Sequence, residues 1–149
     1  MAQYDAVNVA AYIICHCNDN KLPINNPRLQ KILYFTQAEF LVEKGSACFL
    51  DDIEVWPTGP VVPDVYRMYC KFGSAHLYAS ERERTCCKYI STEDIKIIKA
   101  VINECNKFST QYLIELSKHQ LPLPLNYYFF YGHNKAVSPD SIKEFFKSK

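Results

Sequence analysis

The sequence predicts a compact, mainly α-helical single domain over residues 1–149, a bundle of about six or seven helices with at most a short β-hairpin. Three observations carry this prediction. Apolar residues recur at helical spacing in several segments, cap residues and prolines stand where those segments begin, and only 4 of the 149 residues are Gly. The chain is 48% hydrophobic and 22% charged, which suits one globular domain that buries a core. A two-domain protein or an extended disordered chain is therefore not expected.

The N-terminal part of the chain is expected to hold two helices. Asp5 is a suitable N-cap, and apolar residues at helical spacing behind it predict a first helix to about Cys17. Asn26 as a cap and Pro27 as the first helical residue predict a second helix, which runs to about Glu43 and ends just before a glycine.

The second helix carries apolar residues on two opposite faces and is therefore expected to be the central helix, packed on both sides. The two faces hold Leu29, Ile32, Leu33, Thr36 and Phe40 on one side and Tyr34, Phe35, Ala38 and Val42 on the other. Only Gln30, Gln37 and Glu39 lie between them. Lys31 stands on an otherwise apolar face, where it is either a functional amine in an altered environment or a side chain that snorkels to solvent.

The middle of the chain alternates short ordered pieces with a polar connection. Residues 49–60 predict a short extended piece and a turn at Thr58-Gly59-Pro60. Pro63 and Asp64 predict the first turn of a third helix that ends at Gly73. Residues 74–90 are interpreted as an exposed connection with a short strand near residues 86–90.

The C-terminal half predicts three more helices. Ser91 or Thr92 caps an amphipathic helix whose inward positions are Ile95, Ile98, Val101, Ile102 and Cys105. A short helix follows from Ser109 or Thr110 to about Lys118. After a proline-broken segment and a run of five aromatic residues, Ser138 with a following proline starts a last helix, whose apolar stripe is Ile142, Phe145 and Phe146.

Charge and composition narrow the classes of partner. The formal net charge is +1, so no overall positive field indicates a nucleic acid as partner. No apolar run approaches the roughly 20 residues that cross a bilayer, and the start lacks the basic segment of a secretory signal. We therefore expect a cytoplasmic protein without membrane contact. The 7 Cys are odd in number and scattered, which is typical of free thiols in a reducing compartment.

The sequence shows no motif for catalysis, metal or cofactor. Cys15-His16-Cys17 cannot converge on one ion from a helix, because neighbouring side chains point about 100° apart. Cys86 and Cys87 are interpreted as packed or surface thiols, since adjacent cysteines rarely bridge one another. There is no glycine-rich phosphate loop and no nucleophile elbow. We expect no enzyme activity, no metal and no cofactor.

Two local strings carry a family resemblance: LQKILYFTQ at residues 29–37 and WPTGPVVPDVY at residues 56–66. Together they resemble the SocA-like antitoxin domain, also called Panacea, which occurs in GepA-like phage-associated proteins. The resemblance spans residues 4–123. It implies that the matching residues determine the fold: Leu29, Gln30, Leu33, Tyr34, Trp56, Gly59, Pro60, Val61 and Tyr66. Gly59 permits a turn, and Trp56 is expected to fill a gap beside the central helix.

One string departs from the family pattern. Where the family carries T-H-x-E-x-P-W, this chain has Ser117-Lys118-His119-Gln120-Leu121-Pro122-Leu123. If the family residues serve a common partner, this protein either lost that role or uses His119 and the aromatic run instead. The alternative is that the string is structural, since a proline and an apolar residue are kept in kind.

The resemblance implies an antitoxin that binds and neutralises a cognate protein toxin in a bacterial or phage-infected bacterial cell. The residues alone indicate a protein-binding module, because the aromatic content is 14% and no active site is visible. The alternatives are a phage-encoded protein that interferes with a host defence or acts as a proteolytic adaptor, and a helical enzyme whose site is assembled from distant residues. A homo-oligomer is left open.

Five consecutive rings at residues 127–131 cannot all enter a core, because consecutive side chains point in different directions. Some are therefore exposed or covered by a partner. We expect the partner-binding residues to be Lys31, His119, Tyr127, Tyr128 and Tyr131. In the alternative interpretation, the two phenylalanines of the run dock inward and the tyrosines sit at the rim of the core.

Overall fold

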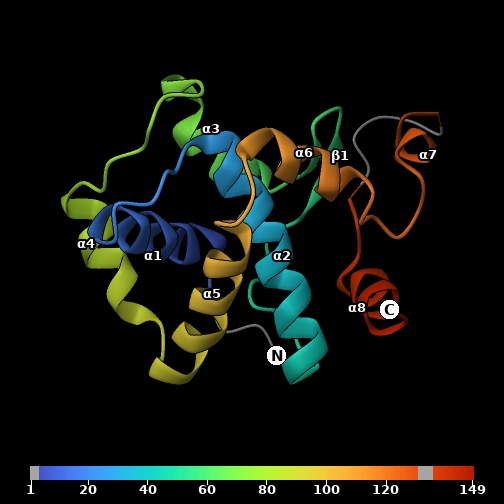
Figure 1. The fold of residues 1–149 in the computed structure, drawn as a ribbon. Coiled ribbons are helices and arrows are strands. Elements are labelled where there is room, and N and C mark those ends of the chain that lie inside the picture. The colour runs from blue at the N-terminus through green and yellow to red at the C-terminus, as the bar shows by residue number, and fades with distance from the viewer. Residues whose placement is uncertain (1–3, 131–135) are drawn as a thin grey trace.

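The structure, a computed structural model, describes residues 4–130 and 136–149 (Figure 1). Within these ranges the chain forms eight α-helices, two short 3-10 helices and one antiparallel hairpin. The elements are α1 (Ala6–Asp19), α2 (Asn26–Lys44), β1 (Glu54–Trp56), β2 (Gly59–Val61), α3 (Pro63–Tyr69), η1 (Cys70–Phe72), α4 (Glu81–Cys86), η2 (Cys87–Tyr89), α5 (Thr92–Cys105), α6 (Thr110–Lys118), α7 (Leu125–Phe130) and α8 (Pro139–Lys147). The mainly helical class and the short hairpin are confirmed.

Helix α2 is the central element, as predicted. It packs against α1, α3, α5, α6, α8 and β2, and it runs through the middle of the molecule in Figure 1. Of its 19 residues, 13 are buried, which confirms packing on both sides. Its N-cap is Asn25 rather than the predicted Asn26, and the Asn25 side chain accepts the backbone N–H of Arg28. Val42, expected on an apolar face, is 36% exposed near the end of the helix.

Two buried glutamines of α2 hold neighbouring loops in place. The side-chain oxygen of Gln30 accepts the backbone N–H of Val62 at 2.8 Å. The side chain of Gln37 accepts the N–H of Cys48 and donates to the carbonyl of Phe49, both at 2.8 Å. These loop groups are buried, so the glutamines supply hydrogen bonds that burial demands.

Arg28 and Tyr34 extend the same arrangement to the C-terminal half. The Arg28 guanidinium donates to the carbonyls of Cys105 and Phe108, at 2.8 and 2.9 Å, where α5 ends. The Tyr34 hydroxyl donates to the carbonyl of Gln120 at 2.6 Å, just after α6. The polar residues of α2 therefore position the segments around it.

The predicted serine caps are confirmed for three helices. Each serine side chain accepts a backbone N–H from the third residue after it, which is typical of an N-cap. The pairs are Ser91 with Asp94, Ser109 with Tyr112, and Ser138 with Ser141.

The strand predicted near residues 86–90 is wrong, because α4 and η2 occupy this segment. Ser80 and Glu83 form a capping box that starts α4. Glu83 is buried and also accepts hydrogen bonds from Tyr69 and Arg82. Residues 74–90 are rich in polar side chains and were therefore interpreted as a connection. The segment contains a helix, and the buried carboxylate of Glu83 ties that helix to Tyr69. Helix α7, formed by part of the aromatic run, was not predicted either.

The structure agrees with the expectation of free thiols, since all seven cysteines are unbridged. In the described ranges, no helix is long and apolar enough to cross a membrane.

Truncation of Leu33 tests the central role of α2. Leu33 is fully buried, so Leu33→Ala is expected to lower the free energy of unfolding by about 2–5 kcal/mol through lost burial and a new cavity. Val42→Ala, on the exposed end of the same helix, is the matched control and is expected to change it by about 0.5 kcal/mol or less. Urea unfolding measures both. An unchanged stability of Leu33→Ala contradicts the two-sided packing.

Candidate functional site

The residues of the two family-like strings form the framework that carries the site. Leu29, Gln30, Leu33 and Tyr34 of α2 are all buried. So are Gly59, Pro60 and Val61 of the hairpin, whereas Trp56 and Tyr66 are half-buried. The strings meet because β2 packs on α2, and α6 packs on both. These positions therefore lie within or against the packed framework of α2, the hairpin and α6.

Lys31 joins the hairpin to α2 from the inside. Its side chain is 1% exposed, and its ammonium nitrogen donates to the carbonyl of Pro60 at 2.9 Å. The expectation that Lys31 snorkels to solvent is therefore wrong. In this conformation the amine also has no direct access to a partner.

Gly59 closes the hairpin against α6. Its φ of +102° favours glycine, and a Cβ there would lie 2.8 Å from the Ser117 hydroxyl oxygen. Ser117 is itself fully buried and donates to the carbonyl of Ile114. The hairpin is thus held between α2 and α6 with no room for a side chain at Gly59.

Burial sets the protonation of Lys31. Desolvation, and secondarily the positive charge of Lys118, lower the pKa of Lys31 to about 7 from its usual 10.5. Near neutral pH the amine is therefore partly neutral, while it keeps its hydrogen bond to the Pro60 carbonyl.

Trp56 joins the hairpin to α3. Its ring lies edge-on against Tyr66, with centroids 4.9 Å apart, and its indole N–H donates to the Glu54 carboxylate at 2.9 Å. We expected Trp56 to fill a gap beside the central helix; the contact that the structure shows is with α3 instead.

The altered string at residues 117–123 forms the end of α6 and the turn after it. Leu121 is buried, and the Gln120 carbonyl is held by Tyr34. His119 is exposed and lines a hollow of about 590 Å³ that extends to Asn126. Ser117 and Leu121 of this string are buried, whereas His119 and Leu123 lie at the surface.

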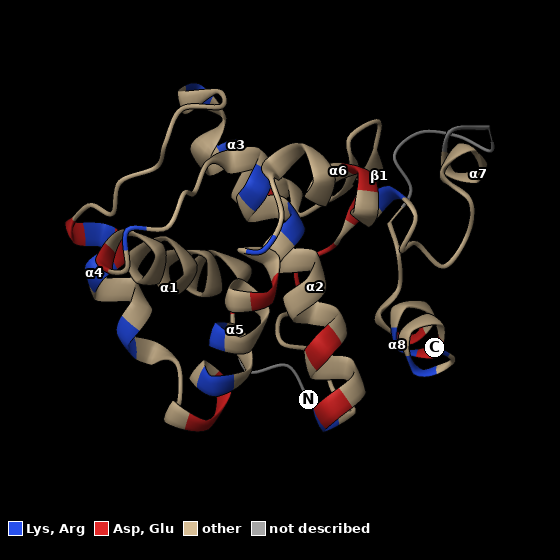
Figure 2. Cartoon of the chain, in the orientation of Figure 1, with Lys and Arg blue, Asp and Glu red and all other residues tan. Residues whose placement is uncertain are grey.

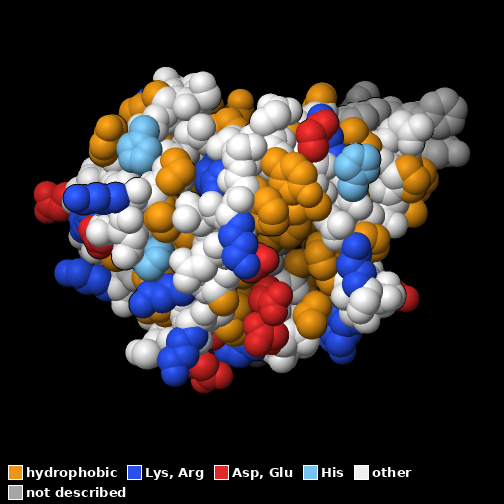
Figure 3. Space-filling view, in the orientation of Figure 1, with side chains coloured by type: hydrophobic (Ala, Val, Ile, Leu, Met, Phe, Trp, Pro, Cys, Tyr) orange, Lys and Arg blue, Asp and Glu red, His pale blue; other side chains and the backbone are white. Residues whose placement is uncertain are grey.

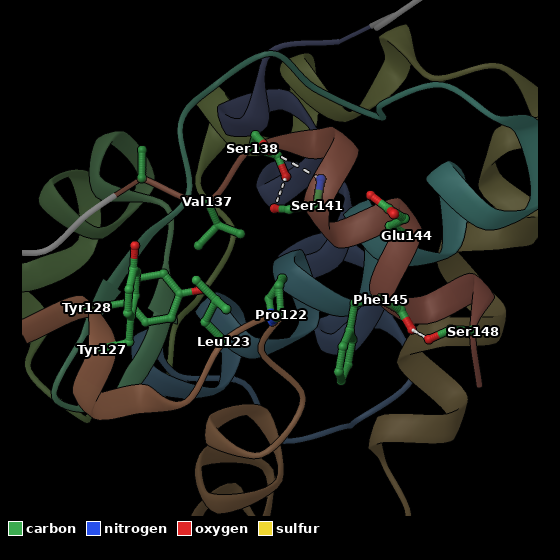
Figure 4. Close-up of a pocket in the computed structure, with 11 residues that line it drawn as sticks. Pro122, Leu123, Tyr127, Tyr128, Val137, Ser138, Ser141, Glu144, Phe145 and Ser148 are labelled. Atoms are coloured by element: carbon green, nitrogen blue, oxygen red, sulfur yellow. Dashed lines mark hydrogen bonds between the residues drawn. The ribbon is translucent and has the colours of Figure 1, made fainter.

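A cleft of about 650 Å³ lies on the other side of Pro122 and Leu123, between α7 and α8. Figure 4 shows the rings of Tyr127 and Tyr128 on one side of it and Phe145 on the other. Its lining is mostly apolar and comes from three separate segments: Pro122, Leu123, Tyr127, Tyr128, Ala136, Val137, Ser138, Ser141, Glu144, Phe145 and Ser148. We name this feature the C-terminal cleft.

The two tyrosines contribute differently to the cleft. Tyr127 is 36% exposed at its rim, whereas Tyr128 is 3% exposed. Their rings meet at right angles, with centroids 5.6 Å apart. Tyr128 is therefore part of the cleft wall, and burial, the larger cause, raises the pKa of its phenol. Tyr127 leaves part of its ring exposed at the rim of the cleft.

Of the five residues predicted to bind a partner, the structure gathers three around the Pro122–Leu123 turn: His119, Tyr127 and Tyr128. Lys31 lies beneath the hairpin, and Tyr131 lies outside the described residues. Sequence reasoning missed Leu123 and Phe145, which complete the cleft. The apolar stripe of the last helix was a signal for Phe145, but the sequence did not show which segment it faces.

No metal centre is visible in the part of the chain that the structure describes, where no three His, Cys, Asp or Glu side chains are grouped to hold an ion.

The buried amine makes folding pH-dependent. Since Lys31 binds its proton less tightly when folded, the unfolded chain carries more protons between pH 7 and its usual pKa, and stability rises with pH in that window. Lys31→Met removes this effect. We expect the stability of the parent to rise relative to Lys31→Met by about 1 kcal/mol per pH unit between about pH 7 and pH 8.5.

Urea unfolding at three pH values in that window measures the difference. The buried thiols, whose pKa values burial raises, are present in both proteins, so their contribution to the pH dependence cancels in this difference. Parallel stability curves for the parent and Lys31→Met contradict the assignment of a neutral buried amine.

The comparisons with known proteins agree with this framework. The family model described as "Antitoxin SocA-like, Panacea domain" matches residues 29–122, which run from the start of α2 to the turn after α6. The chain is also similar to Antitoxin SocA of Caulobacter vibrioides (strain NA1000 / CB15N), with 38% identity over 73 residues. That match covers 49% of this chain and 39% of the relative, so this chain spans well under two thirds of its length.

No solved structure matches the chain. The family model, however, covers more than half of it and includes both strings, the hairpin and Lys31. The chain therefore belongs to the SocA-like antitoxin family, which is defined by the Panacea domain.

Proposed function

We propose that this protein is an antitoxin that neutralises a cognate protein toxin by direct binding, with the C-terminal cleft as its contact surface. Family membership and the relative named Antitoxin SocA support the class of function. The single observation that supports the surface is the cleft itself, which gathers apolar and aromatic side chains outside the framework formed by the hairpin and α2.

The chemistry of the cleft suits a protein rather than a small ion. Leu123 is 43% exposed and Tyr127 36% exposed, and Phe145 faces them from α8. Tyrosine gives a large contact area and a polar tip at low entropic cost, which is why it is frequent at binding hot spots. Glu144 and the serines of α8 supply a polar border beside this apolar centre.

The reactive groups of the core support binding rather than catalysis. Burial raises the pKa of Cys17 to about 11 and that of Cys105 to about 12, so neither offers a thiolate near neutral pH. The amine of Lys31 is enclosed and donates to a backbone carbonyl. We therefore propose that the protein acts without an enzymatic step and without a cofactor.

A double substitution at the rim tests the surface. Tyr127→Ala with Leu123→Ala removes exposed contact area, and we expect it to weaken toxin binding by about thirty-fold, or about 2 kcal/mol. Calorimetric titration with the protein encoded beside this one measures the affinity. His119→Ala, in the neighbouring hollow, is expected to have a smaller effect.

The matched control is Tyr89→Ala. Tyr89 is 68% exposed and belongs to η2, which packs on α1 at the opposite end of the molecule from α7 (Figure 1). This variant should bind the toxin like the parent. Normal binding by a folded Tyr127→Ala/Leu123→Ala protein contradicts the assignment of the cleft. If purified protein inhibits the toxin only when a protease is added, the adaptor alternative replaces direct neutralisation.

A further inference from the structure

A second hollow lies on a different face, between α2, α5, α6 and α8. It measures about 460 Å³, and its floor is apolar: Phe35, Val42, Phe108, Leu113, Leu116 and Phe146. Figure 3 shows hydrophobic side chains gathered in the middle of this face, with acidic side chains directly below them. We name this feature the acidic groove.

The acid side chains of the groove stand on two helices. Glu39 of α2 and Glu104 of α5 line it, and Glu43 lies one turn beyond Glu39. Figure 2 shows the two acidic positions on the lower half of α2. Glu39 and Glu43 contact one another, and burial together with this contact raises the pKa of the Glu39 carboxyl.

The two glutamates of α2 are not paired with a cation in the part of the chain that the structure describes. Within residues 4–130 and 136–149, neither forms an ion pair with a lysine or arginine, and the adjacent Lys44 pairs with Asp94 instead. Glu104 pairs with Lys107 at 3.0 Å. The one lysine that lines the groove, Lys149, lies over the ring of Phe145 at 4.9 Å.

We propose that the acidic groove binds a basic amphipathic helix of a protein partner, with apolar side chains in the groove and lysines or arginines against Glu39 and Glu43. The inference rests on the proposed function only for the identity of that partner, which would be the toxin. An apolar floor beside the two adjacent glutamates of α2 is complementary to such a helix, because a cation there would relieve the repulsion between their carboxylates.

The shape of the groove favours a helix over an extended segment. Helices and the loop after α5 form its walls, and no strand lines it, so a partner strand would find no backbone groups to pair with. A second copy of this chain fits less well. Its amphipathic helix α8 carries two acidic and two basic side chains, so it is not a basic helix. It also already packs its apolar side, including the fully buried Ile142, on α2 of its own chain.

A model peptide tests the groove without any knowledge of the toxin. The probe is a helix of about 18 residues with leucines on one face and lysines on the other, and its counterpart has glutamates in place of the lysines. Fluorescence anisotropy measures binding to the full chain. We expect the lysine peptide to bind, more weakly at high salt, and the glutamate peptide not to bind.

Two pairs of substitutions locate the binding. Glu39→Gln with Glu43→Gln keeps the side-chain shapes and is expected to lower the affinity for the lysine peptide about tenfold. Since it removes a like-charge contact on α2, the thermal stability should be kept or raised. Glu81→Gln with Glu93→Gln makes the same change in net charge at two exposed positions away from the groove and should leave binding unchanged.

Three outcomes overturn the inference: equal binding of the two peptides, equal effects of the two pairs of substitutions, or self-association of the chain that either peptide disrupts. The result is independent of the C-terminal cleft. If the lysine peptide does not bind while the protein still neutralises its toxin, the inference about the groove is wrong and the proposed function stands. If the peptide binds as expected while no toxin is neutralised, the proposed function fails and the groove stands.

Discussion

The rest of the structure depends on the hydrogen bonds between the buried polar side chains of α2 and the backbone of the segments around it. A helix that is buried along most of its length can hold loops as well as helices only if the buried N–H and carbonyl groups of those loops find partners. Gln30, Gln37 and Lys31 supply them for the loop after α2 and the hairpin. Arg28 and Tyr34 do so for the C-terminal half. Among the described residues, the Thr36 hydroxyl is the one buried side-chain polar group without a hydrogen-bond partner.

This arrangement separates the framework from the surface. The family model covers α2, the hairpin and α6, where the side chains of α2 are committed to internal bonds. The C-terminal cleft lies at the edge of that region, between the turn at Pro122 and the helix α8 that follows the matched residues. Because Leu123 and Tyr127 take no part in the hydrogen bonds of α2 named above, changes at these two positions are expected to leave those bonds intact.

Local chemistry made much of the fold predictable. Residues close together in the sequence determine where a helix is apolar and where it begins. The structure confirms the two apolar faces of α2, the serine caps and the prolines at helix starts. Helix α4 was missed although the capping box of Ser80 and Glu83 is a local signal for its start. What the sequence did not show is that Glu83 is buried, since its partner Tyr69 is distant in sequence. The burial of Lys31 was missed for a similar reason, since its partner is the Pro60 carbonyl across the hairpin.

The candidate site could be predicted only in part. An aromatic run indicates surplus apolar surface, but the ring that stays exposed depends on the turn at Pro122 and on α8, which no local pattern specifies. The acidic groove was beyond sequence reasoning altogether, because it combines side chains of α2, α5, α6 and α8 that meet only in the folded chain.

We propose that the protein inactivates a toxin by binding to it rather than by catalysing a reaction. Titration of a fixed toxin concentration, far above the dissociation constant, with purified protein tests this claim most directly. Direct binding predicts that toxin activity falls linearly to a sharp end point at a fixed molar ratio and does not change with incubation time. Complete inactivation by a small fraction of an equivalent, progressing with time, would show a catalytic mechanism and contradict the claim.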